Sequence, residues 1–171
     1  MNLNFEPQLE KKEVFQKVKT FLDSNDFNII NSDQSRPWGG FFVIDETQSQ
    51  KFIDFFFRNV DDSQKQSSGK VSPKILIVEK GKRLSWQYHY RRSELWKVIG
   101  GRVGVIQSEN DRETAIQTKS VNEIITLQQG ERHRLIGLDS WGIVAEIWKH
   151  TDYNNPSDED DIVRLQDDFG R

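Results

Sequence analysis

The sequence predicts an all-β domain, a sandwich or closed barrel of short strands, preceded by one amphipathic helix. Short apolar or alternating runs recur along the chain, and clusters of Gly, Asp, Asn and Ser separate them, as is typical of such folds. Hydrophobic residues make up 35% of the chain and include eleven Phe and five Trp, which argues against disorder. A length of 171 residues fits a single domain, since about 150 residues per domain is usual.

The helix is expected between Leu9 and Leu22, beginning after Pro7. Apolar residues recur there at helical spacing, at Val14, Phe15, Val18, Phe21 and Leu22. Such a stripe normally faces a core, so we expect this helix to pack on the outside of the main domain. Residues 1–34 are therefore predicted to form a helical extension, and residues 35–171 the barrel with its C-terminal tail.

Seven runs after Ser35 are predicted to be strands, and the polar stretch 61–73 a surface loop between two of them. The predicted strands are Gly40–Ile44, Phe52–Phe57, Lys74–Glu79, Leu95–Ile99, Val103–Gln107, Glu123–Leu127 and Ile143–Lys149. The tail 152–171 begins with an acidic run, and Ile162, Val163, Leu165 and Phe169 give it apolar side chains that can dock on the barrel.

Charge and composition exclude several classes of function. A net charge of -3 and a pI near 5.7 leave no basic face for nucleic acid. The chain has no apolar run of about 18 residues, so membrane insertion is not expected and a cytoplasmic location is the default. It has no cysteine, so any metal ion must be bound by nitrogen and oxygen.

A candidate metal site lies in the segment 81–101. Residues two apart on a strand share a face, so Gln87 and His89 project together. A turn at 91–93 would bring Glu94 opposite His89, with Trp96 and Val98 on the face of Glu94. His133 is a fourth candidate, because Gly130 permits a tight turn before a short apolar strand. Imidazole, carboxylate and amide groups suit one divalent ion, most readily Zn, with Mn, Fe, Co or Ni as alternatives.

The spacing of these residues resembles the two cupin motifs. Gly81, Gln87, His89, Glu94 and Gly101 follow the first motif, with Gln87 at the position of its first histidine. Gly130 and His133 follow the second motif, although Gln128 stands where proline is usual. The resemblance implies a cupin fold, a jelly-roll barrel also described as a double-stranded β-helix.

Four stretches extend the resemblance to the cupin domain of type II mannose-6-phosphate isomerases, a domain often fused behind a mannose-1-phosphate guanylyltransferase. They are RPWGG (36–40), LSWQYHYRRSELW (84–96), GERHRL (130–135) and EDDIVRLQDDFGR (159–171). No Gly-rich nucleotide loop precedes Arg36, so the resemblance implies a stand-alone isomerase half. The chain departs from the family at Tyr90, Arg91 and Leu95, where the family tends to have histidines.

The resemblance implies that the protein interconverts mannose 6-phosphate and fructose 6-phosphate. Such a reaction uses a metal ion as a Lewis acid, held here by Gln87, His89, Glu94 and His133. Glu146 resembles a glutamate kept in the family and is the candidate base, and cationic side chains can bind the phosphate. The remaining candidates are, for catalysis, Lys74 and Arg134 and, for substrate binding, Arg36, Trp38, Arg91 and Arg164.

Alternatives to this isomerase remain open. The fold also hosts non-catalytic sugar-binding domains, iron dioxygenases and metal-free epimerases, the last of which would use His133 with Tyr88 or Tyr90. The aromatic residues Trp38, Trp86, Tyr88 and Trp96 are expected to be barrel core, or else a wall for a sugar ring. A sugar phosphate is the expected ligand, and exposed edge strands favour a homodimer.

Overall fold

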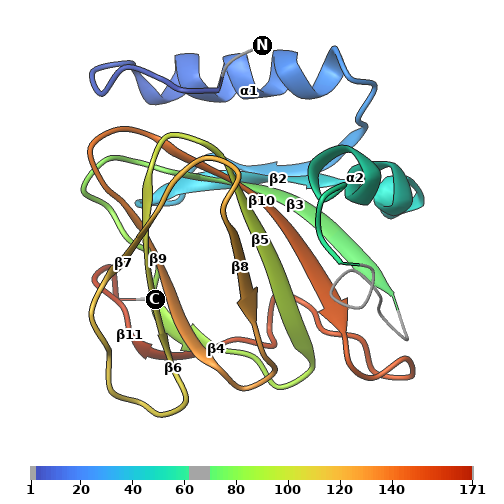
Figure 1. Cartoon of the computed structure of the whole chain (residues 1–171), viewed down its shortest axis with the longest axis vertical. Coiled ribbons are helices and arrows are strands. Elements are labelled where there is room, and N and C mark those ends of the chain that lie inside the picture. The colour runs from blue at the N-terminus through green and yellow to red at the C-terminus, as the bar shows by residue number, and fades with distance from the viewer. Residues whose placement is uncertain (1–2, 62–69, 171) are drawn as a thin grey trace.

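A computed structural model of the chain describes residues 3–61 and 70–170. Eleven strands in this part of the chain form two antiparallel sheets that enclose the interior of a barrel (Figure 1). Sheet A has the order β1-β2-β3-β10-β5-β8, and sheet B the order β11-β4-β9-β6-β7. The predicted cupin barrel is therefore confirmed. Within these ranges, no helix combines the length and the apolar character needed to cross a bilayer.

The strands of sheet A contain most of the runs that were predicted from the sequence. They are β1 (Ile29–Asp33), β2 (Gly39–Ile44), β3 (Val71–Val78), β10 (Gly142–His150), β5 (Arg92–Gly100) and β8 (Ile124–Leu127). Almost every residue of β3 and β10 is buried, because both faces of the sheet are covered. This explains why these strands are continuous apolar runs instead of alternating ones.

The strands of sheet B are shorter and more polar. They are β11 (Val163–Gln166), β4 (Trp86–Tyr88), β9 (Arg132–Gly137), β6 (Val103–Ser108) and β7 (Gln117–Lys119). The expected strand after Gly130 is β9. The tail does dock on the barrel, since β11 pairs with β4 and Phe169 packs against the interior cluster.

Helix α1 (Lys11–Asp23) covers the outer face of sheet A, as Figure 1 shows at the top of the molecule. Its buried residues are the five apolar ones that predicted it. They join one cluster with Phe42, Ile75 and Ile147 of the sheet. The boundary expected between residues 34 and 35 separates β1 from β2, which pair with each other, so the first 34 residues are more than a helical extension.

The prediction of a strand at Phe52–Phe57 is wrong. The segment forms helix α2 (Ser49–Phe56), which follows a short 3-10 helix η1 (Glu46–Gln48). Phe52 and Phe56 lie one turn apart and are both buried in the outer cluster. A short apolar run does not distinguish a strand from a buried helix by periodicity alone, and here packing on the sheet favours the helix.

The loop expected at 61–73 is shorter than predicted at its C-terminal end. Residues 62–69 of that stretch lie outside the described residues, and Val71, Ser72 and Pro73 already belong to β3. Strand β3 brings Lys74 into the barrel, at the position that pairs with Glu146 of β10.

Candidate metal centre and pocket

Three side chains from separate segments of the barrel converge on one point. His89 follows β4, Glu94 lies on β5 in the opposite sheet, and His133 lies on β9. Glu94 Oε1 is 3.4 Å from His89 Nε2, and Glu94 Oε2 is 3.6 Å from His133 Nε2. Ligands about 2.0–2.1 Å from a tetrahedral ion are roughly 3.3 Å apart. The spacing of these donors therefore fits a shared cation, and the cluster could bind a metal ion.

Both imidazoles present the nitrogen that a metal ion requires. Their Nδ1 atoms contact backbone carbonyls, at 2.5 Å from Asp161 O for His89 and at 3.0 Å from Glu131 O for His133. A carbonyl can only accept, so Nδ1 carries the proton in each ring and Nε2 offers a lone pair. Burial lowers the pKa of His89 to about 3 and also lowers the pKa of His133, so both rings are neutral at neutral pH.

His133 Nε2 gives the most direct test of whether these residues fit a metal ion. This atom is buried and has no hydrogen-bond partner among the described residues. An unpaired lone pair beside a buried carboxylate is costly unless a cation or donor approaches it. The residues present therefore fit the expected divalent ion.

Glu94 supplies the negative charge of the cluster. Its burial favours the neutral acid, but Arg92, through its charge and its hydrogen bond, and to a lesser extent the two histidine rings outweigh burial and lower the pKa to about 2. Arg92 donates from Nε to Glu94 Oε1 at 2.7 Å and from Nη2 to His89 Nε2 at 3.0 Å. Arg92 was not among the residues predicted from the sequence, although it lies two residues before Glu94 on the same strand and so shares its face.

Gln87 reaches the same region, but it presents its nitrogen. Its Oε1 accepts a hydrogen bond from Ser85 Oγ at 2.6 Å, while its Nε2 lies 3.4 Å from His89 Nε2. Only the amide oxygen can bind a metal ion. Gln87 can therefore be the expected fourth ligand only after its amide group turns over.

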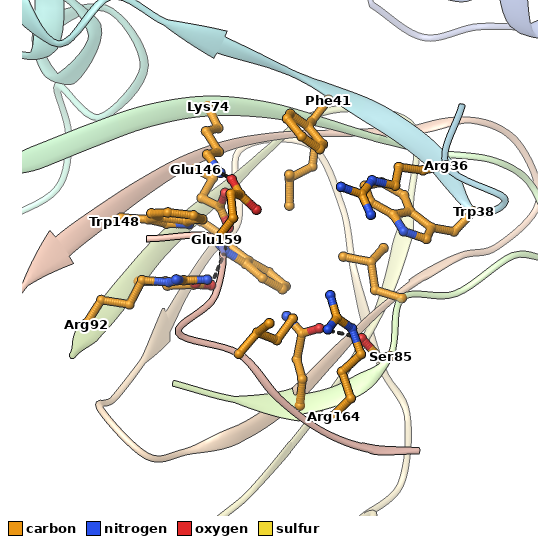
Figure 2. Close-up of a pocket in the computed structure, with 16 residues that line it drawn as sticks. Arg36, Trp38, Phe41, Lys74, Ser85, Arg92, Glu146, Trp148, Glu159 and Arg164 are labelled. Carbon is orange, nitrogen blue, oxygen red and sulfur yellow. Dashed lines mark hydrogen bonds and ion pairs between the residues drawn. The ribbon is translucent and has the colours of Figure 1, made fainter. Parts of the chain in front are cut away.

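A cavity of about 80 Å³, partly open to solvent, adjoins this cluster, and Figure 2 shows the side chains that line it. Its buried wall includes Gln87, Glu94, Trp96 and Glu146. His89 and His133 lie behind this wall and are each 2% exposed.

Glu146 faces the cavity, which alternation along its strand alone could not decide. Its Oε1 accepts a hydrogen bond from Trp96 Nε1 at 2.9 Å, and the same indole nitrogen lies 3.1 Å from Glu94 Oε2. Burial, helped by the charge of Glu94, raises the pKa of Glu146 to about 8, against the opposing effect of Lys74. Glu146 therefore holds a proton at neutral pH and is poised to lose it just above.

Lys74 contributes a buried cation to the cavity. Its ammonium group pairs with Glu159 of the tail and lies 3.4 Å from the centre of the Trp148 ring. Burial lowers its pKa, and the nearby carboxylates of Glu146 and Glu159 oppose that effect.

The other predicted residues divide into two groups. Arg36, Trp38 and Arg164, which were predicted to bind substrate, line the cavity. Arg91 does not, because its guanidinium group bonds to Asn155, Asp158 and the carbonyl of Pro156. Arg134 lies outside the cavity as well. It alternates with the inward-facing His133 and Leu135 and bonds to Glu113 and Gln166.

Of the four aromatic residues, Trp38 and Trp96 line the cavity and also belong to the interior apolar cluster. Trp86 and Tyr88 do not line it. Trp86 donates from Nε1 to the carbonyl of Asp111, and the guanidinium group of Arg132 stacks over the Tyr88 ring. Of these four, only Trp38 and Trp96 could form an aromatic wall for a sugar ring, and Phe41 and Trp148, which were not predicted, line the cavity as well.

Comparison with known proteins assigns the family. The model of the family described as "Mannose-6-phosphate isomerase C-terminal" matches residues 57–167. The chain belongs to this family. The expected resemblance to the cupin domain of these isomerases is thereby confirmed, and the matched range contains His89, Glu94 and His133.

Relatives in this family include larger enzymes. The chain is 25% identical over 161 residues to the mannose-1-phosphate guanylyltransferase of Salmonella montevideo, covering 94% of this chain and 27% of that protein. It is 29% identical over 136 residues to the xanthan biosynthesis protein XanB of Xanthomonas campestris, covering 80% of this chain and 23% of that protein. The chain thus spans about a quarter of the length of the curated relatives it matches.

Solved structures show the same fold at low identity. A mutant of the oxalate decarboxylase of Bacillus subtilis superposes with a TM-score of 0.56 at 12% identity, covering 79% of this chain and 30% of that one. This likeness concerns the fold alone.

Proposed function

We propose that the protein is a metal-dependent sugar-phosphate isomerase that interconverts mannose 6-phosphate and fructose 6-phosphate. The observation that carries the proposal is the cluster of His89, Glu94 and His133 beside a cavity that contains a proton-carrying Glu146. The description of the family supports the choice of substrate.

The ion would be held by His89, Glu94 and His133, with Gln87 as a fourth ligand once its oxygen faces the site. When bound, a divalent ion supplies a Lewis acid that stabilises negative charge on substrate oxygens. The nitrogen and oxygen donors suit zinc and equally manganese, iron, cobalt or nickel.

The proton transfer is assigned to Glu146. Aldose–ketose interconversion moves one proton from C2 to C1 and another from the C2 oxygen to the C1 oxygen. A group that takes a proton from carbon and returns it works best when its pKa lies near the working pH. Burial gives Glu146 such a pKa, about 8, and the Trp96 indole holds its Oε1 atom in place.

The phosphate is assigned to the cations of the cavity. Lys74 lies in its buried wall, and Arg36 and Arg164 line it as well (Figure 2). One guanidinium group can bind two phosphate oxygens in a bidentate manner, whereas an ammonium group acts as a point charge. The three cations together select a substrate with an anionic end.

The test is an isomerase assay on protein stripped of metal and reloaded with one divalent ion at a time. We expect turnover of mannose 6-phosphate only with metal. We also expect Glu146→Gln to lower kcat by about 100-fold or more while the metal content stays unchanged. Glu109→Gln, an exposed change of the same kind, is the control. Absence of turnover with every ion, or full activity of Glu146→Gln, would contradict the proposal.

Arg92 favours a second candidate, a non-catalytic domain that binds sugar phosphates. Its guanidinium group already contacts Glu94 and the Nε2 atom of His89, so a cation occupies part of the cluster without any metal ion. In that case mannose 6-phosphate would bind equally well with and without metal, and equilibrium titration would detect binding in the absence of turnover.

A further inference from the structure

The tail segment 157–161 is anchored to the barrel at both ends. Ser157 N donates to His150 Nδ1 at 2.8 Å, and Ser157 Oγ donates to Asp161 Oδ2 at 2.6 Å. The carboxylate of Asp161 also accepts the backbone N–H groups of Tyr90 and Arg91, at 3.0 and 2.9 Å. Both anchors are buried, at 7% and 6% exposure, so the backbone between them has a fixed position.

Glu159 lies between these anchors and extends its carboxylate into the cavity. Its side chain is 62% exposed, although the side chain that it contacts, Lys74, is only 6% exposed. The anchoring bonds are made by other residues, so a change of side-chain rotamer releases Glu159 from Lys74 without breaking any of them. The contact is therefore one that an incoming ligand can displace.

Lys74 itself cannot leave the cavity so easily. Its ammonium group lies over the Trp148 ring and 5.1 Å from the centre of the Phe41 ring. A buried ammonium group requires a nearby anion, and the ion pair that Lys74 forms is with Glu159. Glu159 is then the carboxylate that balances Lys74, and any ligand that displaces it has to be anionic.

We propose that Glu159 is a displaceable internal anion that occupies the phosphate position on Lys74. The phosphate group of the ligand exchanges with this carboxylate, which turns out toward solvent. Arg36 and Arg164 line the same cavity and complete the anion subsite (Figure 2). Glu159 thereby lowers the affinity for phosphate. Anions that bind Lys74 more weakly than this carboxylate does are excluded from the subsite. The inference rests on the proposed function only for the identity of the anion, a sugar phosphate.

The test measures binding of inorganic phosphate to the full chain by calorimetry and needs no turnover. Glu159→Gln removes the competing charge, and we expect it to bind phosphate about two- to fivefold more tightly than wild type, the range set by one part-exposed ion pair. Asp160→Asn is the matched control, because it removes the same charge from the exposed neighbouring residue and should change the affinity by less. Lys74→Met should abolish binding.

Equal affinities of Glu159→Gln and Asp160→Asn, weaker binding by Glu159→Gln, or no phosphate binding by any of the proteins would overturn the inference. The outcome is separate from that of the isomerase assay. An active enzyme whose two variants bind phosphate equally refutes the internal anion alone. An inactive protein in which Glu159→Gln binds more tightly refutes the isomerase alone.

Discussion

Replacing Glu146 with glutamine should change how the stability of the protein depends on pH. Glu146 is 4% exposed, and its burial raises the pKa from 4.5 to about 8. In the unfolded chain the carboxyl group ionises near its ordinary value. Between these two pH values the folded state holds a proton that the unfolded state has lost, so the free energy of unfolding falls as the pH rises.

The size of the effect follows from the shift. Stability changes by about 1.36 kcal/mol per pH unit while only the folded state is protonated. The titration of Glu146 alone should therefore lower the free energy of unfolding of the wild-type protein by about 2 kcal/mol between roughly pH 6 and pH 8. Glutamine keeps the shape and the oxygen that accepts from Trp96, but it has no proton to lose. The stability of Glu146→Gln relative to wild type should thus rise by that amount over the same range.

Urea unfolding in the presence of a chelator, at several values from about pH 6 to about pH 9, measures this difference. The chelator keeps metal binding out of the comparison. His89 and His133 titrate in both proteins, so their contributions cancel when the two curves are subtracted. Glu109→Gln, which changes an exposed carboxylate, should run parallel to wild type. If the curve for Glu146→Gln also runs parallel to wild type, Glu146 does not carry a raised pKa.

Three further results are expected. Glu94→Gln removes the only carboxylate of the donor cluster and should weaken divalent-ion binding, measured by chelator competition, beyond the roughly 10- to 100-fold typical of outer-shell changes. Asp161→Asn places an amide nitrogen against one of the two backbone N–H groups that the carboxylate accepts and loosens the carbonyl that orients His89. It should therefore weaken the same binding by about 10- to 100-fold, with Asp160→Asn unchanged. Gly39→Ala should lower the free energy of unfolding in urea by about 1 to 3 kcal/mol, because the φ of Gly39 is +139° and a Cβ there would lie 2.0 Å from Ile77 O. For each of the three variants, a value equal to that of wild type would refute the contact on which the prediction rests.

The side chains of the site that lie on strands could be predicted from the sequence, because strand periodicity is a local property. The spacing of Gln87 and His89, and of Glu94 and Trp96, places each pair on one face whatever the rest of the chain does. The route of the chain between them differs from the expected hairpin. Residues 89–91 lead from sheet B to sheet A, so Glu94 approaches His89 across the barrel and does not pair with its strand.

The remaining parts of the site depend on contacts distant in sequence. Asp161, which orients His89, is 72 positions away from it in the sequence, and Glu159 is 85 positions away from its partner Lys74. No local pattern predicts such contacts, and an acidic run normally lies in solvent. Arg134 illustrates the opposite error. Its place beside His133 in a family-like stretch indicated a catalytic role, yet adjacent residues on a strand point to opposite faces.

Arg92 connects the tail to the metal centre. Its guanidinium group binds Glu94 and His89 on one side and donates to Ser157 Oγ and the carbonyl of Asp158 on the other. The lone pair of His89 that a metal ion requires is the one that accepts from Arg92. A bound ion therefore has to replace that hydrogen bond, and its net affinity is the free energy of metal ligation minus that of the Arg92 hydrogen bonds it breaks. Because Ser157 and Asp158 hold Arg92 in place, the tail influences metal affinity through this arginine as well as through the carbonyl of Asp161.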